Sequence, residues 1–226
     1  MGIPVSVITP ASRGVEHLAH LLRDFKNQTF KWFEHVIVYD GTIPAEVQTF
    51  MDAHMQDYNI KFANIEKDVG DMKVAPGTRP RNHGVSLATG NWVVFADDDD
   101  RYRDTYVETL VTGLQDNMIN VVQMSCQASR TYVNGNENEI RLVPEIGHPF
   151  PACGHVGTPC FIIPRSWAIE DPWQHEPDHD YRFLKRLIIK HNPTIRIIPG
   201  MQIDVDGIVL RGLKDWVSMP PFYRGD

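Results

Sequence analysis

The first half of the chain alternates short apolar runs with stretches of helical periodicity, and this alternation restricts the possible folds more than any other feature. Apolar runs rich in β-branched residues predict strands at residues 5–9, 35–42, 60–65, 91–96 and 120–125. The stretches between them predict helices at residues 15–28, 44–56, 78–90 and 104–117. In the first of these, Val15, Leu18, Leu22 and Phe25 share one face. Continuous apolar strands alternating with helices indicate a parallel sheet with helices packed on both faces.

The second half of the chain has a different pattern. Asn134 and Gly135 separate two alternating runs within residues 130–143, which predicts a β-hairpin. Residues 147–159 are rich in glycine and proline and predict an irregular loop. A strand is predicted at 159–164, a helix at 178–192, and one or two strands within 196–209. We therefore expect an α/β protein, a three-layer α/β/α sandwich whose mostly parallel, Rossmann-like sheet gains a small antiparallel or hairpin addition.

Length, charge and cysteine content narrow the class of protein. A chain of 226 residues can form one domain with its own core, and because no linker or repeat divides it, we expect a single domain over residues 1–226. No apolar run approaches the roughly 20 residues that span a bilayer, and a net charge of −7 disfavours nucleic acid as a partner. Cys126, Cys153 and Cys160 form no C-x-x-C pair, which argues against a disulfide framework and favours the reducing cytoplasm.

Four consecutive carboxylates, Asp97 to Asp100, directly follow the apolar run at 91–96. Two unit charges about 4 Å apart repel by roughly 4 kcal/mol near a protein surface, so these groups either all face water or share a cation. Ligands of such sheets bind beyond the carboxyl ends of the strands, where Asp40 and Asp97 both lie. Mg²⁺ typically takes one or two carboxylates and leaves positions for substrate phosphates. The cluster could instead be a solvated loop that caps the next helix, but its place at the ligand-binding rim favours a cation.

Several short motifs occur in one order along roughly residues 4–110. They are Thr9-Pro10, Asn27-Gln28-Thr29, Asp40-Gly41-Thr42, Arg81-Asn82 with Gly84, Ala88 and Gly90, and Asp97-x-Asp99-Asp100. In this order the motifs resemble the N-terminal half of family 2 glycosyltransferases of the GT-A fold. The chain departs from that pattern at Tyr39, where the family has the first Asp of Asp-Asp-Gly, and at Pro80, where it has Ala.

The resemblance implies an enzyme that binds Mn²⁺ or Mg²⁺ and transfers a sugar with inversion. The donor would be a nucleotide-diphosphate sugar, most simply a UDP-sugar, bound by residues 1–125, and residues 126–226 would bind an acceptor hydroxyl of unknown identity. Asp99, in the Asp-x-Asp motif, would be the metal ligand. The residues implied to contact the nucleoside, diphosphate, ribose or sugar of the donor are Thr9, Pro10, Asp40, Arg81, Asp97 and Asp98.

An inverting transfer needs a group that takes the proton from the acceptor hydroxyl, usually a carboxylate within reach. The family places this Asp in a Glu-Asp pair at the start of a late helix that carries Arg-Leu further along. Aligning Arg186-Leu187 with that Arg-Leu puts Asp180 at the base position and His179 in place of Glu, with Asp178 as the alternative base. Capping of the helix N-terminus is the competing interpretation for one of these two aspartates.

Two other classes of protein also fit an acidic rim. A nucleotidyltransferase or phosphohydrolase could use the same carboxylates, but the chain has neither G-x-x-x-x-G-K-[ST] nor G-x-G-x-x-G to hold a phosphate. A non-catalytic GT-A-like protein could bind a nucleotide or metal without turnover. The sequence leaves the sugar, the nucleotide base and the acceptor open.

Overall fold

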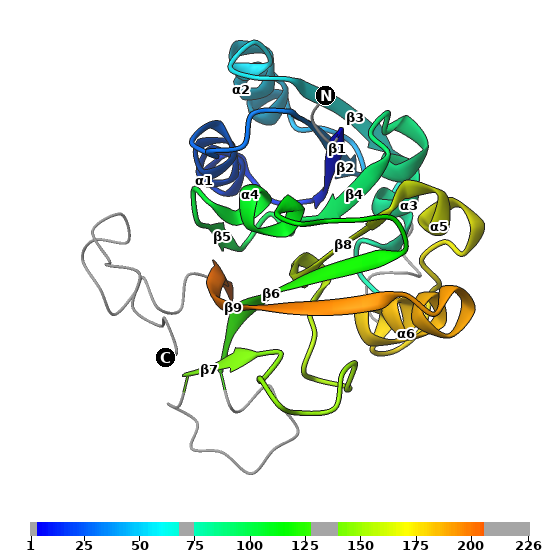
Figure 1. Cartoon of the computed structure of the whole chain (residues 1–226). Helices are drawn as coiled ribbons and strands as arrows, with labels where there is room; N and C mark the ends of the chain where they lie inside the picture. The colour runs from blue at the N-terminus through cyan, green and yellow to red at the C-terminus, as the bar shows by residue number, and fades with distance from the viewer. Residues whose placement is uncertain (1–3, 68–74, 128–139, 206–226) are drawn as a thin grey trace.

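The structure, a computed structural model, describes residues 4–67, 75–127 and 140–205 (Figure 1). Within these residues nine strands form one sheet. They are β1 (Val5–Ala11), β2 (Phe33–Asp40), β3 (Ile60–Ile65), β4 (Trp92–Phe95), β5 (Arg101–Tyr102), β6 (Met118–Gln127), β7 (Ile140–Val143), β8 (Phe161–Pro164) and β9 (Thr194–Asp204). The helices are α1 (Val15–Lys26), α2 (Ala45–His54), α3 (Thr78–Leu87), α4 (Tyr106–Val111), α5 (Arg165–Glu170) and α6 (His179–His191), with a short 3₁₀ turn at Thr158–Cys160.

The sheet has the order β3-β2-β1-β4-β8-β6-β9-β5, and β7 pairs with β6 off this path. The first four strands are parallel, and the register aligns Ile8 of β1 with Val36 of β2 and Phe95 of β4. β8 is antiparallel to both β4 and β6, whereas β9 runs parallel to β6. Because β1, β2 and β4 run the same way, the segments that follow them meet at one edge of the sheet.

Helices cover both faces of the sheet, as their apolar sides require (Figure 1). One buried cluster joins β1 and β2 to α1, α2 and α4, with Leu18, Phe25 and Met51 fully or almost fully buried. The other cluster joins β4 and β8 to α3, α5 and α6, with Phe95 and Phe183 fully buried. The expected three-layer α/β/α arrangement is therefore confirmed, with an antiparallel addition made by strands from the second half.

Some elements differ from the prediction. The helix expected at 104–117 stops at Val111, because Gly113 and Asn117 adopt positive φ angles of 66° and 57° that end the helix and turn the chain. β6 contains the strand predicted at 120–125, but β8 lies between it and β4. The short helix α5 was not predicted.

The predicted hairpin is only partly visible. β7 pairs antiparallel with β6, as a hairpin would, whereas Asn134 and Gly135 lie outside the described residues. Residues 206–209 of the expected last strand also lie outside them. Among the helices that the structure describes, none combines the length and the apolar character needed to cross a membrane.

Candidate active site

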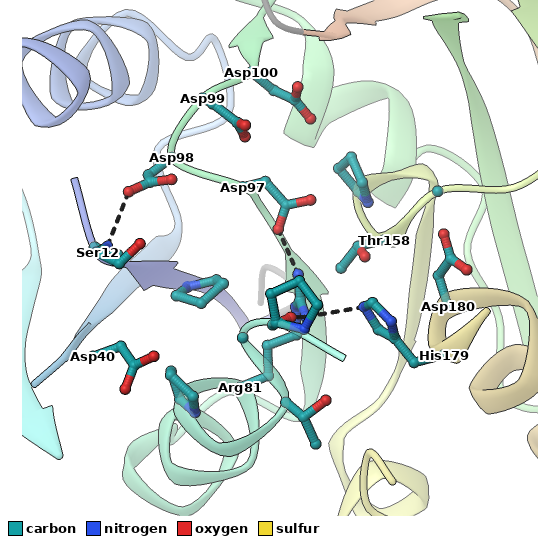
Figure 2. Close-up of a pocket in the computed structure, with 18 of the residues that line it drawn as sticks. Ser12, Asp40, Arg81, Asp97, Asp98, Asp99, Asp100, Thr158, His179 and Asp180 are labelled. Carbon is teal, nitrogen blue, oxygen red and sulfur yellow. Dashed lines mark hydrogen bonds and ion pairs between the residues drawn. The ribbon is translucent and has the colours of Figure 1, made fainter. Parts of the chain in front are cut away.

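A cleft of about 380 Å³ opens at the edge of the sheet where β1, β2 and β4 end (Figure 2). One side is lined by residues 10–13, which end β1 and follow it, by Asp40 at the end of β2, and by residues 76–81 at the start of α3. Residues 97–100 form its rim. The opposite side carries Met124 of β6, residues 157–159, His179 and Asp180 of α6, and Val205. The first half of the chain thus supplies one wall and the second half the other.

The carboxylates of the rim point to different partners and are not stacked on one another (Figure 2). Asp98 is buried and accepts a hydrogen bond from the backbone N–H of Ser12 at 3.1 Å, and burial raises the pKa of this carboxyl group. Asp99 accepts from Nη2 of Arg13 at 2.6 Å. Asp97 turns instead toward Arg81. The mutual repulsion expected from four adjacent charges is therefore reduced by separation and by cationic partners.

The rim suits a divalent cation whose coordination is completed by the phosphate oxygens of a bound molecule. Among the described residues, no three His, Cys, Asp or Glu side chains gather closely enough to form a complete protein site for a metal. Asp97 and Asp99 nevertheless both line the cleft, and hard oxygen ligands in such small number fit Mg²⁺ or Mn²⁺ completed by phosphate oxygens. Arg13, whose side chain is 45% exposed, has room to leave Asp99 for such an ion.

Arg81 is buried at the base of the cleft, with only 4% of its surface exposed. Its Nη2 donates to Asp97 at 2.7 Å, and its Nη1 donates to the backbone carbonyl of Pro76 at 2.9 Å and lies 3.4 Å from Nε2 of His179. Gly77 leaves room for this group, because its φ is +78° and a Cβ there would approach Nη1 to 2.9 Å. Arg81 therefore links the segment before α3, the segment after β4 and the start of α6, and it also lines the cleft that would receive a ligand.

Asp180 lies in the first turn of α6, on the side of the cleft opposite the rim (Figure 2). Burial raises its pKa from the ordinary 3.8 to about 6, with Arg81 lowering the pKa and Asp97 raising it. A carboxylate with such a pKa is ionised at neutral pH yet basic enough to accept a proton. Asp178 precedes the helix at its N-cap position, is exposed, makes no side-chain cap hydrogen bond and does not line the cleft. Of the two candidate bases, the geometry brings only Asp180 to the cleft.

The cleft also differs from the expected set of donor contacts. Pro10, Asp40, Arg81 and Asp97 to Asp99 line it, but Thr9 does not. Thr9 is fully buried on the other face of β1, where its hydroxyl hydrogen bonds with Nε2 of His35 at 2.9 Å. Successive side chains of a strand point to opposite faces, which places the side chains of Thr9 and Pro10 on different faces of β1.

Several residues of the cleft were not singled out in the sequence. They include Ser12 and Arg13 after β1, Gly77 and Thr78 at the start of α3, and Gly157 and Thr158 at the start of the 3₁₀ turn. The sequence could have predicted that Ser12 and Arg13 lie at the cleft, because the residues after β1 must lie at the same edge of the sheet as those after β2 and β4. The last segment lies beside β8, whose insertion into the sheet the sequence did not reveal.

Comparison with known proteins identifies the family. The model of Glycosyl transferase family 2 matches residues 6–168, most of the chain, and the chain therefore belongs to this family. Glycosyltransferase GlyA of Streptococcus pneumoniae serotype 4 (strain ATCC BAA-334 / TIGR4) is 29% identical over 135 residues, which are 60% of this chain and 18% of that protein. The chain thus corresponds to a small part of this relative.

Solved structures show the same fold. S. aureus TarS 1–349 superposes with a TM-score of 0.67 at 19% identity, covering 89% of this chain and 60% of that one. Glucosyl-3-phosphoglycerate synthase from Mycobacterium tuberculosis, crystallised with Mn²⁺, UDP and glucosyl-3-phosphoglycerate, gives 0.62 at 15% identity, covering 90% and 71%. The expectation of a GT-A-type fold is confirmed by these similarities.

Proposed function

We propose that this chain is an inverting, metal-dependent glycosyltransferase that moves a sugar from a nucleotide-diphosphate sugar to an acceptor hydroxyl. The observation that supports this most is the placing of one basic carboxylate, Asp180, across a single cleft from the acidic rim at Asp97 to Asp100. An inverting transfer needs a base on one side of the reacting carbon and a means of stabilising the departing diphosphate on the other. Membership of the family supports the same activity.

The donor would lie along the wall formed by the first half of the chain. Asp40 at the end of β2 offers carboxylate oxygens that can accept from the N–H of a base such as uracil, beside Pro10. TarS 1–349 has been crystallised with UDP-GlcNAc, and the mycobacterial synthase with UDP, whereas a mannosyltransferase of the same fold has been crystallised with GDP-Man. We infer a UDP-sugar for this chain, because two of these three proteins were crystallised with a uridine nucleotide and because Asp40 lies where the nucleobase would bind.

A metal ion, Mn²⁺ or Mg²⁺, would be held at Asp99, with Asp97 and Asp98 as donor contacts along the rim. When bound, it would supply positive charge that stabilises the diphosphate as it departs. This role explains why the chain places carboxylates beside a wall that must receive phosphates. Without a cation, the negative rim would repel the donor, because like charges a few ångströms apart cost several kcal/mol in a partly buried site.

Asp180 would take the proton from the acceptor hydroxyl as that oxygen attacks the anomeric carbon. Its carboxylate lies at the start of α6, where burial keeps its pKa near 6 and the ionised form is available at neutral pH. The acceptor would approach along the wall supplied by residues 126–226, and we propose that the whole chain is one domain divided in this way. The cysteines at positions 126, 153 and 160 form no C-x-x-C pair, and this pattern supports a cytoplasmic location.

The proposal is tested by measuring nucleoside diphosphate release from a panel of UDP-, GDP- and dTDP-sugars, with Mn²⁺ or Mg²⁺ and with chelator. We expect metal-dependent release from one UDP-sugar even without acceptor, because water can replace the hydroxyl slowly. Asp180→Asn should reduce release by about 100-fold or more while leaving Mn²⁺·UDP binding intact. Asp178→Asn is the matched control, because it makes the same chemical change two residues earlier in the chain and outside the cleft.

Donor and metal binding without turnover, over a broad acceptor panel, would indicate a binding protein. Full activity of Asp180→Asn would reject the assigned base. Release of nucleoside monophosphate instead of diphosphate would indicate a phosphohydrolase.

A further inference from the structure

Three side chains that line the cleft, together with a tryptophan packed against two of them, form one connected group that joins the two walls. Arg81 belongs to α3, Asp97 follows β4, His179 opens α6, and Trp173 lies in the connection before α6. The guanidinium of Arg81 bonds Asp97 at 2.7 Å and reaches Nε2 of His179 at 3.4 Å (Figure 2). The same guanidinium lies 5.1 Å from the ring centre of Trp173.

The group has a rigid support. Trp173 is held by both of its backbone polar groups, since Asn82 donates to its carbonyl and accepts from its N–H, each at 2.9 Å. Its ring stacks on Phe183 of α6 at 4.0 Å and meets the ring of His179 edge-on at 5.7 Å. Arg81 and His179 therefore both contact an aromatic ring that hydrogen bonds and stacking hold in place.

The contact between Arg81 and His179 requires a neutral imidazole. Arginine can only donate, so Nε2 of His179 must accept, and the ring proton must be on Nδ1. Burial, with a further contribution from Arg81, lowers the pKa of His179 to about 4, against opposing effects of Asp97 and Asp178. His175 lowers it further. A glutamate at position 179 would be an anion, and it would compete with Asp97 for the guanidinium of Arg81.

We propose that His179 is a positioning residue, whose neutral ring holds the Arg81 guanidinium between Asp97 on the donor wall and Asp180 on the acceptor wall. This inference rests on the proposed function. Its consequence is electrostatic, because Arg81 acts on both carboxylates at once: it pairs with Asp97 and favours the ionised form of Asp180. If the imidazole is removed, the guanidinium keeps its bonds to Pro76 and Asp97 but loses its contact with His179, and it can then turn away from α6.

The test is a titration of Asp180 that does not depend on turnover. The carboxyl carbons of aspartate are labelled with ¹³C in the full chain, and the Asp180 signal is assigned by its loss in Asp180→Asn. We expect His179→Ala to move the midpoint of Asp180 to higher pH than in the wild type, because Arg81 no longer favours the ionised form. His179→Gln, whose amide oxygen can accept from Arg81, should restore the wild-type midpoint.

Two further variants make the test specific. Arg81→Gln should move the midpoint in the same direction as His179→Ala, and the double variant should show no more than the larger single effect, because both changes remove one interaction. His17→Ala on α1, outside the cleft, should leave the midpoint unchanged. If His179→Ala fails to fold, His179→Leu, which fills the space of the ring but cannot accept from Arg81, should raise the midpoint in the same way, and an unchanged midpoint there would overturn the positioning role.

Turnover then separates this inference from the proposed function. On the UDP-sugar that the wild type hydrolyses, His179→Ala should lower kcat by about tenfold, with little change in KM. The acidic limb of the pH profile of kcat should also move to higher pH. An unchanged Asp180 midpoint in His179→Ala, or additive shifts in the double variant, would overturn the positioning role. Absence of any donor turnover by the wild type would reject the proposed function, and the titration would still decide the role of His179.

Discussion

Replacing Asp180 by Asn should make the protein more stable at neutral pH while it removes activity. In the folded protein the pKa of Asp180 is about 6, against an ordinary 3.8, because burial disfavours its charge. One pKa unit corresponds to about 1.4 kcal/mol, so ionising this carboxyl in the folded state costs about 3 kcal/mol at pH 7. The side chain is partly exposed, and solvent screening reduces the expected gain in free energy of unfolding to about 1–2 kcal/mol.

The sign of the pH dependence is fixed by the direction of this pKa. Because the folded-state pKa lies above the unfolded one, the wild type gains stability as the pH falls from about 6 to 3.8, where Asp180 becomes protonated in both states. The advantage of Asp180→Asn should therefore be largest at pH 7 and above, and should vanish near pH 4. For a chain of this length, about 1–2 kcal/mol corresponds to a rise of roughly 2–8 °C in Tm.

The assay is thermal unfolding of both proteins between pH 4 and 8, followed by circular dichroism. Asp178→Asn serves as control, since Asp178 is exposed and outside the cleft, and it should leave Tm unchanged. An Asp180→Asn protein no more stable than the wild type at pH 7, or equally stabilised at pH 4 and pH 7, would refute the reasoning that burial sets the basicity of this carboxylate.

Three further changes have expected outcomes. Burial alone would raise the pKa of Glu34, but hydrogen bonds from Lys61, Ser6 and Thr89 outweigh it and lower the pKa from 4.5 to about 2. Glu34→Gln should therefore cost about 2–3 kcal/mol in urea unfolding at pH 7 and less at pH 3, because this contribution is complete above pH 4.5 and lost toward pH 2. Asp99→Asn should weaken UDP binding roughly tenfold or more in Mn²⁺ and leave binding in chelator unchanged, as measured by calorimetry. Gly90→Ala should lower the free energy of unfolding by about 1–3 kcal/mol or more, since its Cβ would lie 2.7 Å from the backbone N of Ser6, and an unchanged Tm would contradict this packing.

The elements that the sequence predicted well are those whose burial is uniform. β1, β2 and β4 are buried along almost their whole length, so each leaves a continuous apolar run. The parallel direction of these strands then fixes the edge at which Asp40 and Asp97 meet. α1 has a regular apolar face, and its predicted bounds agree with the structure to within two residues.

The elements that the sequence predicted poorly depend on contacts between distant segments. The place of β8 between β4 and β6 follows from pairing across the sheet, which no local pattern encodes. Leu114 continues the apolar periodicity of Val107, Leu110 and Val111, yet the positive φ angles of Gly113 and Asn117 turn the chain before it completes the helix.

The sequence predicted which residues are candidates for the site, but it did not predict the contacts that these residues make with one another. The acid cluster is visible in the sequence as carboxylates at the end of a strand, whereas Asp180 was assigned through the family resemblance, by aligning Arg186-Leu187. That Asp98 turns to Ser12 and Asp99 to Arg13 depends on the loop after β1, 86 residues earlier in the chain. The contact of Arg81 with His179 spans 98 residues and could be seen only in the folded protein.

The central claim is that Asp180 activates a hydroxyl that attacks opposite the departing nucleoside diphosphate. The measurement that tests it most directly is the anomeric configuration of the first product formed from the UDP-sugar that the chain uses, followed by proton NMR immediately after mixing with Mn²⁺. An α-linked donor should give the β-anomer first, from attack on the opposite face of the sugar. First appearance of the α-anomer would contradict the inverting mechanism and the role of Asp180 as its base.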